Sequence, residues 1–219
     1  MNKIPSSVSL NSITFSPRKL LTDRRILMYT FNTPNRNGKT AIVIMKNPSE
    51  SFKGLRRDKL NLNYHDTFID RSTQNAMKLL EQLGYSRAIH LNIFSFFSGK
   101  PGALNHRYGF VKKGNMQTNP ICWTKWINLS ANMKVLKKTL KNNKNADVIC
   151  AWGGTSDGPE AGYYEYFVKK ILTTLKGLHK GILYQVIQKG DTPKILSEVE
   201  YPLHPQKWIE TAKLELSPP

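Results

Sequence analysis

The chain has few cysteines and no long apolar run, and each lack excludes a class of protein. Its two cysteines, Cys122 and Cys150, are too few for a disulfide framework and lack the C-x-x-C spacing of zinc or iron–sulfur sites. No apolar stretch approaches the roughly 18 residues of a membrane span, and the polar first residues lack the core of a signal peptide. We therefore expect a soluble, cytoplasmic protein with no membrane partner.

Acidic residues are also scarce. The 219 residues include 33 Lys and Arg but only 15 Asp and Glu, which gives a formal net charge of +18. Residues 82–146 contain no Asp or Glu, although many of the cations lie there. This excess predicts a polyanionic partner. It disfavours a hydrolase of free nucleotides or nucleosides, because a small substrate does not require so extended a positive surface.

A lysine-rich helix is predicted inside this acid-free stretch. Its apolar residues, from Leu129 to Leu140, recur at helical spacing and fall on one face. Five lysines share the opposite face: Lys134, Lys137, Lys138, Lys141 and Lys144. This lysine face suits the phosphates of a nucleic acid. A solvated face without a partner would carry the same pattern, so both interpretations stay open.

The loop before this helix, from Ser98 to Trp126, combines glycines, cations and aromatic residues. A flexible backbone with cations and flat rings suits a nucleic-acid strand, because bases stack on aromatic side chains. The alternative is a surface loop whose aromatic residues pack on their own domain.

Alternating apolar runs and amphipathic segments predict an α/β fold. The expected strands are Ile26–Phe31, Ala41–Met45, Ala88–Phe94, Asp147–Trp152 and Gly181–Ile187. Helices are expected around residues 76–83, 129–140, 164–175 and 206–214. This alternation favours a largely parallel sheet covered on both faces. We expect one domain over residues 1–219, with a basic loop and helix inserted at about 98–145, and residues 1–19 carry little structural signal.

Polar motifs follow the expected strands, at the sheet edge where open α/β folds bind ligands. Asn47 comes after the strand Ala41–Met45 and could orient a water, although an ordinary Asn-Pro turn explains it as well. The preceding Lys46 carries an amine that can form a Schiff base or contact a phosphate. Strand alternation aims Lys46 away from Asn47, which favours the phosphate contact or a salt bridge.

Asn92 and His204 are the other polar candidates. Asn92 interrupts an apolar strand with a donor and an acceptor, which fit either the edge of a nucleobase or a tie between loops. His204 is either a core histidine or a hydrogen-bond donor to a developing anion. The turn Trp152-Gly153-Gly154 matches no nucleotide-binding fingerprint, and we expect a tight strand-to-helix turn there.

Taken in order, these motifs resemble those of the uracil-DNA glycosylase superfamily. That superfamily has Asp-Pro or Asn-Pro after the first core strand, an Asn that closes the second, Trp-Gly after the third and His-Pro near the end. The chain is more similar to an uncharacterised prokaryotic branch that looks like antiviral (antiphage) glycosylases acting on modified bases. The matching motifs are Asn47–Ser49, Asp70–Ser72, Gly84-Tyr85, Asn92–Phe94, Ala151–Gly153 and His204-Pro205.

The resemblance implies a three-layer α/β/α sandwich with a mostly parallel central sheet. It implies a monofunctional DNA glycosylase that flips a modified or mismatched pyrimidine, such as a hypermodified phage cytosine, out of the helix. The enzyme would hydrolyse the N-glycosidic bond and leave an abasic site. The implied partner is DNA, no metal and no small-molecule cofactor are expected, and we expect a monomer.

The resemblance also gives roles to single residues. Asn47 would hold the attacking water, Asn92 would bind the polar edge of the flipped base, and His204 would stabilise negative charge on the departing base. Because an amide cannot take up a proton at neutral pH, Asp70 is the nearest carboxylate candidate, with helix capping as its alternative role. The remaining candidates for binding the base are Pro48, Ser49, Phe52, Tyr64 and Phe68.

The expected DNA contacts are cations and one aromatic residue. They are Lys46, Lys100, Arg107, Lys112, Lys113, Lys134, Lys137, Lys138, Lys141, Lys207 and Trp208. The alternative function is a basic nucleic-acid-binding protein without catalysis. Such a protein would bind with steep salt dependence, and substitution of Asn47 or His204 would change no measured property.

Overall fold

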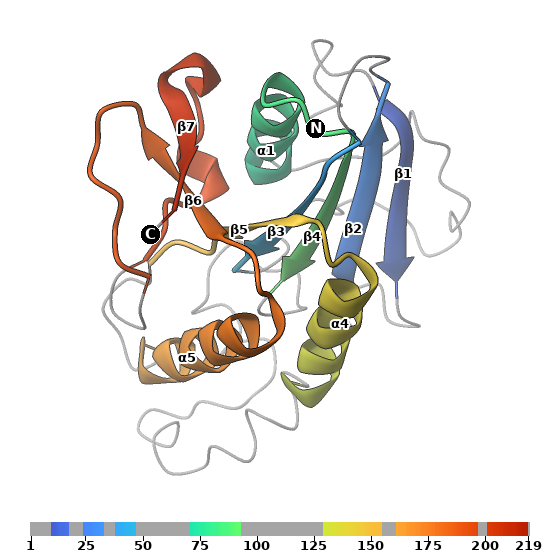
Figure 1. The fold of residues 1–219 in the computed structure, drawn as a ribbon, viewed down its shortest axis with the longest axis vertical. Helices are drawn as coiled ribbons and strands as arrows, with labels where there is room; N and C mark the ends of the chain where they lie inside the picture. The colour runs from blue at the N-terminus through green and yellow to red at the C-terminus, as the bar shows by residue number, and fades with distance from the viewer. Residues whose placement is uncertain are drawn as a thin grey trace, which may run out of the picture.

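The computed structural model describes seven stretches of the chain. They are residues 10–17, 24–32, 38–46, 71–92, 129–154, 161–196 and 201–218. Within these stretches lie one sheet and three α-helices (Figure 1). Among the described helices, none has the length and apolar character needed to cross a membrane.

The described strands form a mixed sheet in the order β1-β2-β4-β3-β5-β6-β7. They are β1 (Leu10–Pro17), β2 (Arg24–Phe31), β3 (Thr40–Met45), β4 (Arg87–Asn92), β5 (Asp147–Ala151), β6 (Leu183–Gln188) and β7 (Leu214–Ser217). The central strands β4, β3, β5 and β6 are parallel, whereas β1, β2 and β7 are joined by antiparallel pairing. The fold is therefore α/β, but the prediction of a mostly parallel sheet is wrong at both sides of the sheet.

Burial explains which strands the sequence predicts. All residues of β3 after Thr40 are buried, and the same holds for β4 after Arg87, so both strands read as short apolar runs. In β1 no two apolar residues are adjacent, and among the described strands β1 pairs only with β2. This weak pattern explains why β1 was not predicted.

Three helices confirm the internal helices that periodicity predicts. They are α1 (Arg71–Gln82), α4 (Leu129–Asn142) and α5 (Ala161–Leu178). α1 stops just before Gly84, whose φ of 89° lies in the left-handed region that glycine adopts without strain. The helix boundaries therefore follow local sequence signals.

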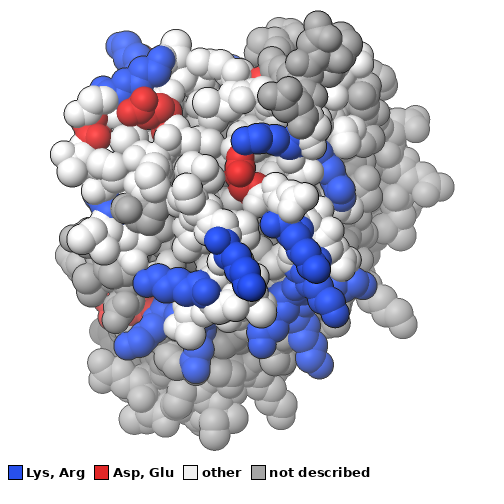
Figure 2. Space-filling model, in the orientation of Figure 1, with Lys and Arg blue, Asp and Glu red and all other residues white. Residues whose placement is uncertain are grey.

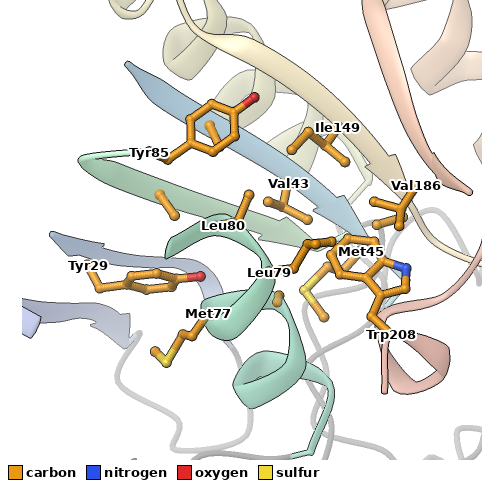
Figure 3. Packing of buried hydrophobic residues seen from close by; sticks show 14 of the residues in the cluster. Tyr29, Val43, Met45, Met77, Leu79, Leu80, Tyr85, Ile149, Val186 and Trp208 are labelled. Carbon is orange, nitrogen blue, oxygen red and sulfur yellow. The ribbon is translucent and has the colours of Figure 1, made fainter. Parts of the chain in front are cut away.

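Two apolar clusters cover the two faces of the sheet. On one face, α4 and α5 pack on β3 and β5, and Leu140 of α4 belongs to the same buried cluster as Ile44 of β3. On the other face, α1 and the C-terminal segment pack on the same strands, where Trp208 lies among Met45 and Leu79 (Figure 3). Successive residues of a strand point to opposite faces, which divides the core into these two halves.

The helix expected at residues 206–214 does not form. Two short 3₁₀ turns, η2 (Pro205–Lys207) and η3 (Thr211–Lys213), are followed by β7, which pairs with β6. Trp208, between the two turns, is fully buried in the core on the α1 side of the sheet. Burial of this large ring and pairing of β7 thus override the local helical propensity.

Candidate active site

The carboxyl ends of β3, β4 and β5 lie side by side. Met45, the last residue of β3, pairs with Asn92 of β4 and with Ala151 of β5. Lys46 and the turn Trp152-Gly153-Gly154 therefore begin at the same edge of the sheet, which we call the carboxyl edge. Lys46, Asn92 and the glycine turn therefore meet there, as the order of the strands predicted.

Lys46 links two of these strand ends. Its amine donates a hydrogen bond to the carbonyl oxygen of Gly154. Burial lowers the pKa of the Lys46 amine from 10.5 to about 8, because removal of water disfavours the charged form. The amine thus contacts the glycine turn of the protein itself, and the DNA contact expected of Lys46 stays a prediction.

His204 packs directly against Gly153. The φ of Gly153 is 65°, and a Cβ at this position would lie 2.7 Å from the Cβ of His204. Gly154 is similarly close to Tyr201, since a Cβ there would lie 3.1 Å from Cδ2 of the ring. Any side chain at Gly153 would meet both backbone strain and a steric clash. The Trp-Gly and His-Pro motifs are therefore in contact at the carboxyl edge.

Hydrogen bonds from two other side chains hold the His204-Pro205 turn. The amide of Asn75 in α1 donates to the carbonyl oxygen of Pro205 at 3.0 Å. The indole N–H of Trp208 donates to the carbonyl oxygen of Leu203 at 3.2 Å. Both donors belong to buried residues, so the backbone on either side of His204 is held by the core.

The backbone also selects the tautomer of His204. The N–H of Gln206 donates a hydrogen bond to Nδ1 of the imidazole at 3.2 Å. Because Nδ1 accepts this bond, the proton of the neutral ring lies on Nε2. In its neutral form the half-buried ring thus presents an N–H donor at Nε2. Such a donor can stabilise negative charge that develops on a leaving group.

Asn92 closes β4 as a buried polar residue that is only 6% exposed. Strand alternation places it on the same face of the sheet as His90, whose Nε2 lies 2.7 Å from the hydroxyl of Tyr29. Burial raises the pKa of Tyr29, so this hydroxyl keeps its proton at neutral pH. Polar groups are thus concentrated on the α1 side of β4, and the carboxamide of Asn92 offers both a donor and an acceptor.

Many predicted site residues lie outside the described stretches, and their roles stay predictions. These are Asn47, Pro48, Ser49, Phe52, Tyr64, Phe68, Asp70, Lys100, Arg107, Lys112 and Lys113. Among the residues expected to contact DNA, those of α4 are exposed: Lys134, Lys137, Lys138 and Lys141. Lys207 is exposed in η2, three residues after His204.

Trp208 corrects the prediction of an aromatic DNA contact. Its side chain is 0% exposed and packs with residues of α1, β3 and β6. A side chain without accessible surface cannot reach a base or a phosphate. Trp208 therefore stabilises the fold and positions the turn that carries His204.

Three contributors to the site were not predicted. Asn75 lies in the middle of a helix, Tyr201 lies before a proline, and Gly153 was expected to serve only as a turn. The glycine pair after an apolar strand was a usable signal for a tight turn. The partner of Gly153 could not be predicted, because 50 residues separate it from His204 in the sequence.

The described residues of the site offer amide, imidazole and amine groups. Within the described stretches, no group of three His, Cys, Asp or Glu side chains is placed to hold a metal ion. Cys150 is buried, and burial raises the pKa of its thiol, so it is unsuited to act as a nucleophile. The described part of the site can bind polar groups and donate hydrogen bonds.

These observations define an α/β protein with a candidate site at the carboxyl edge of a mixed sheet. The chain belongs to the family described as "protein of unknown function (DUF1643)", whose model matches residues 25–205. The matched range runs from β2 to Pro205, so it contains Lys46, Asn92, Gly153 and His204. No curated protein and no solved structure matches the chain.

Proposed function

We propose that the protein is a DNA glycosylase that hydrolyses the N-glycosidic bond of a modified or mismatched pyrimidine. The observation that carries this proposal is the packing of His204 on Gly153 at the edge where β4 ends with Asn92. This arrangement brings the Trp-Gly and His-Pro motifs together at one edge of the sheet, which supports the glycosylase resemblance. Helices on both faces of the sheet are compatible with the three-layer fold of that superfamily.

The chemistry assigns a separate task to each polar group. A base that leaves the sugar takes the electron pair of the N-glycosidic bond and becomes anionic, and Nε2–H of His204 would donate a hydrogen bond to it. The carboxamide of Asn92 would bind the polar edge of the flipped base. Asn47 follows Lys46 directly in the sequence and would hold the water that attacks C1′, and the proton that this water loses would pass to the carboxylate of Asp70.

The proposed substrate is DNA, and the base is expected to be a mismatched or modified pyrimidine, including hypermodified phage cytosines. The net charge of +18 supports a polyanionic substrate over a free nucleotide. Hydrolysis of this bond requires no cofactor. A role in antiviral defence would follow if the base occurs only in phage DNA.

The test is a panel of duplex oligonucleotides that carry uracil, mismatched thymine, hydroxymethylcytosine or glucosylated hydroxymethylcytosine. Each duplex is incubated with the purified protein and then heated in alkali, which breaks strands at abasic sites. We expect breaks at one class of base. The variant His204→Ala should lose about 2.7–4 kcal/mol of transition-state stabilisation, or roughly 10²–10³ in rate, which is typical of the removal of one such donor.

The control variant is His179→Ala, at a half-buried histidine just after α5. It should excise bases at the rate of the unaltered protein. Asn47→Ala should abolish excision while DNA binding is retained. If no base of the panel yields alkali-sensitive sites, or if His204→Ala excises at the normal rate, the proposal is wrong.

The exposed lysines of α4 favour a second candidate, a nucleic-acid-binding protein without catalysis. It would bind DNA with steep salt dependence and leave every base of the panel intact. The panel therefore separates the two functions.

A further inference from the structure

α5 carries lysines that extend the predicted lysine face of α4. On α4 and the turn after it, the exposed lysines are Lys134, Lys137, Lys138, Lys141 and Lys144. On α5 and the turn after it, they are Lys169, Lys170, Lys176 and Lys180. The two helices pack on the same face of the sheet. Basic side chains accordingly predominate in Figure 2 over the region where Figure 1 shows α4 and α5.

Acidic side chains barely interrupt this surface. Along residues 129–146 and 161–182, the stretches that hold both helices and the turns after them, Glu165 is the single acidic residue. Asp147 begins β5 nearby, but its carboxylate accepts a hydrogen bond from the hydroxyl of Tyr85 at 2.7 Å. The same carboxylate lies 3.8 Å from the amine of Lys39. The potential over the two helices is therefore positive across both.

The connections place much of this charge away from the candidate active site. α4 ends at Asn142 and β5 begins at Asp147, while α5 ends at Leu178 and β6 begins at Leu183. The last turns of both helices therefore lie at the amino ends of the parallel strands. A six-residue strand such as β3 is about 17 Å long, so the two edges of the sheet are about that far apart.

We propose that lysines near the C-terminal ends of α4 and α5, and in the turns after them, form a second nucleic-acid-binding surface, separate from the candidate active site. This amino-edge basic surface consists of Lys137, Lys141, Lys144, Lys176 and Lys180. Its ligand is the phosphodiester backbone. Lysine ammonium groups act as point charges on phosphates and do not distinguish bases. The surface binds without regard to sequence, and the proposal does not depend on base excision.

Helix stability provides a different explanation for part of the pattern. Cations in the last turn of a helix interact favourably with its dipole, and Lys141 and Lys176 hold such positions. The dipole does not account for Lys144 and Lys180, which follow the helices, or for the near absence of acidic side chains. A test must therefore separate binding from folding.

The test compares two variants with the same loss of charge. The first carries Lys→Gln at four positions of the amino-edge basic surface: Lys137, Lys141, Lys144 and Lys176. The control carries Lys→Gln at four exposed lysines elsewhere: Lys78, Lys189, Lys194 and Lys213. Binding to unmodified duplex DNA is measured by fluorescence anisotropy over a series of salt concentrations. Thermal unfolding of both variants checks the fold.

The slope of log K against log[salt] decides the outcome. Each phosphate contact contributes about 0.9 to this slope on duplex DNA and about 0.7 on single strands, so loss of four contacts should reduce it by about 3–4. The control should retain the slope of the unaltered protein. The same titration on single-stranded DNA of equal length shows which form the surface prefers.

Three results would overturn the proposal. Equal slopes for the two variants would mean that net charge alone governs binding. An unchanged slope in the first variant would mean that these lysines do not contact DNA. Competition by polyglutamate as strong as by DNA would point to an acidic protein as the partner instead. The DNA in this test carries no modified base, so the measurement does not depend on excision. All three results can therefore be interpreted even if the protein is not a glycosylase.

Discussion

The two edges of the sheet are built in different ways. At the carboxyl edge, single residues that are far apart in the sequence meet, as Lys46 meets Gly154 and Gly153 meets His204. At the amino edge, one residue type recurs on the exposed faces of two helices. The carboxyl edge depends on specific contacts between atoms, whereas the amino edge depends on the number of positive charges that it carries. Single substitutions should therefore have large effects at the carboxyl edge and small ones at the amino edge.

The largest effect is expected from Trp208→Ala. The indole is fully buried and donates a hydrogen bond to Leu203, so its removal leaves a cavity beneath the His204 turn. We expect the free energy of unfolding to fall by about 3–5 kcal/mol, the usual range for such a truncation. Urea denaturation measures this change.

Trp208→Phe sharpens the comparison between the edges. It retains most of the apolar volume but removes the N–H that holds the Leu203 carbonyl, so the fold should survive with a less constrained His204. Base excision should fall while the salt dependence of DNA binding stays the same. If the rate of excision and the salt dependence of DNA binding both fell, the two surfaces would not be separate.

The next largest effect is expected from Gly153→Ala. Its φ of 65° and the 2.7 Å approach of the new Cβ to His204 add backbone strain to a clash. We expect a loss of roughly 2–4 kcal/mol in the free energy of unfolding. Displacement of the imidazole should lower excision as well.

Two other glycines serve as matched controls. Gly190 has a φ of 90° but no atom within 4 Å of the new Cβ, so Gly190→Ala should cost only the strain, about 1–2 kcal/mol. Gly177 lies in α5 with nothing within 4 Å, and Gly177→Ala should stabilise the helix by up to about 1 kcal/mol. If Gly153→Ala costs no more than Gly190→Ala, the His204 contact is not tight.

The same contrast explains how much the sequence could predict. The lysine face of α4 and the internal helices depend on spacing within a few residues, and periodicity identifies them. The buried strands β3 and β4 were found for the same reason. The antiparallel edge strands and the two 3₁₀ turns depend on pairing and packing with distant residues, so β1 was missed and a C-terminal helix was wrongly expected.

The candidate site divides in the same way. The order of the motifs predicted that Asn92 and the glycine turn share an edge, because strand ends can be located from the sequence. The burial of Trp208 and the bond from Asn75 to Pro205 could not be predicted, since each joins segments more than a hundred residues apart. Local composition carries no information about such contacts.

A pH-dependent effect on stability is expected at Lys46. Its pKa is about 8 in the folded protein and 10.5 when the amine is fully hydrated. Between these values the unfolded chain holds a proton that the folded protein has released, so the free energy of unfolding rises with pH. Below pH 8 the amine is charged in both the folded and the unfolded state, so the destabilisation caused by its partial burial is fully present.

Lys46→Met removes this cost. The free energy of unfolding of the variant minus that of the unaltered protein should be greatest below pH 8 and should decline as the pH rises towards 10.5. Loss of the hydrogen bond to Gly154 shifts this difference by a constant and leaves its pH dependence unchanged. Urea denaturation at several pH values measures it, with Lys137→Met, at an exposed lysine of the amino-edge basic surface, as the matched variant. A difference that is flat with pH would mean that the Lys46 amine is hydrated, and the carboxyl edge would then differ less from the amino edge than its contacts indicate.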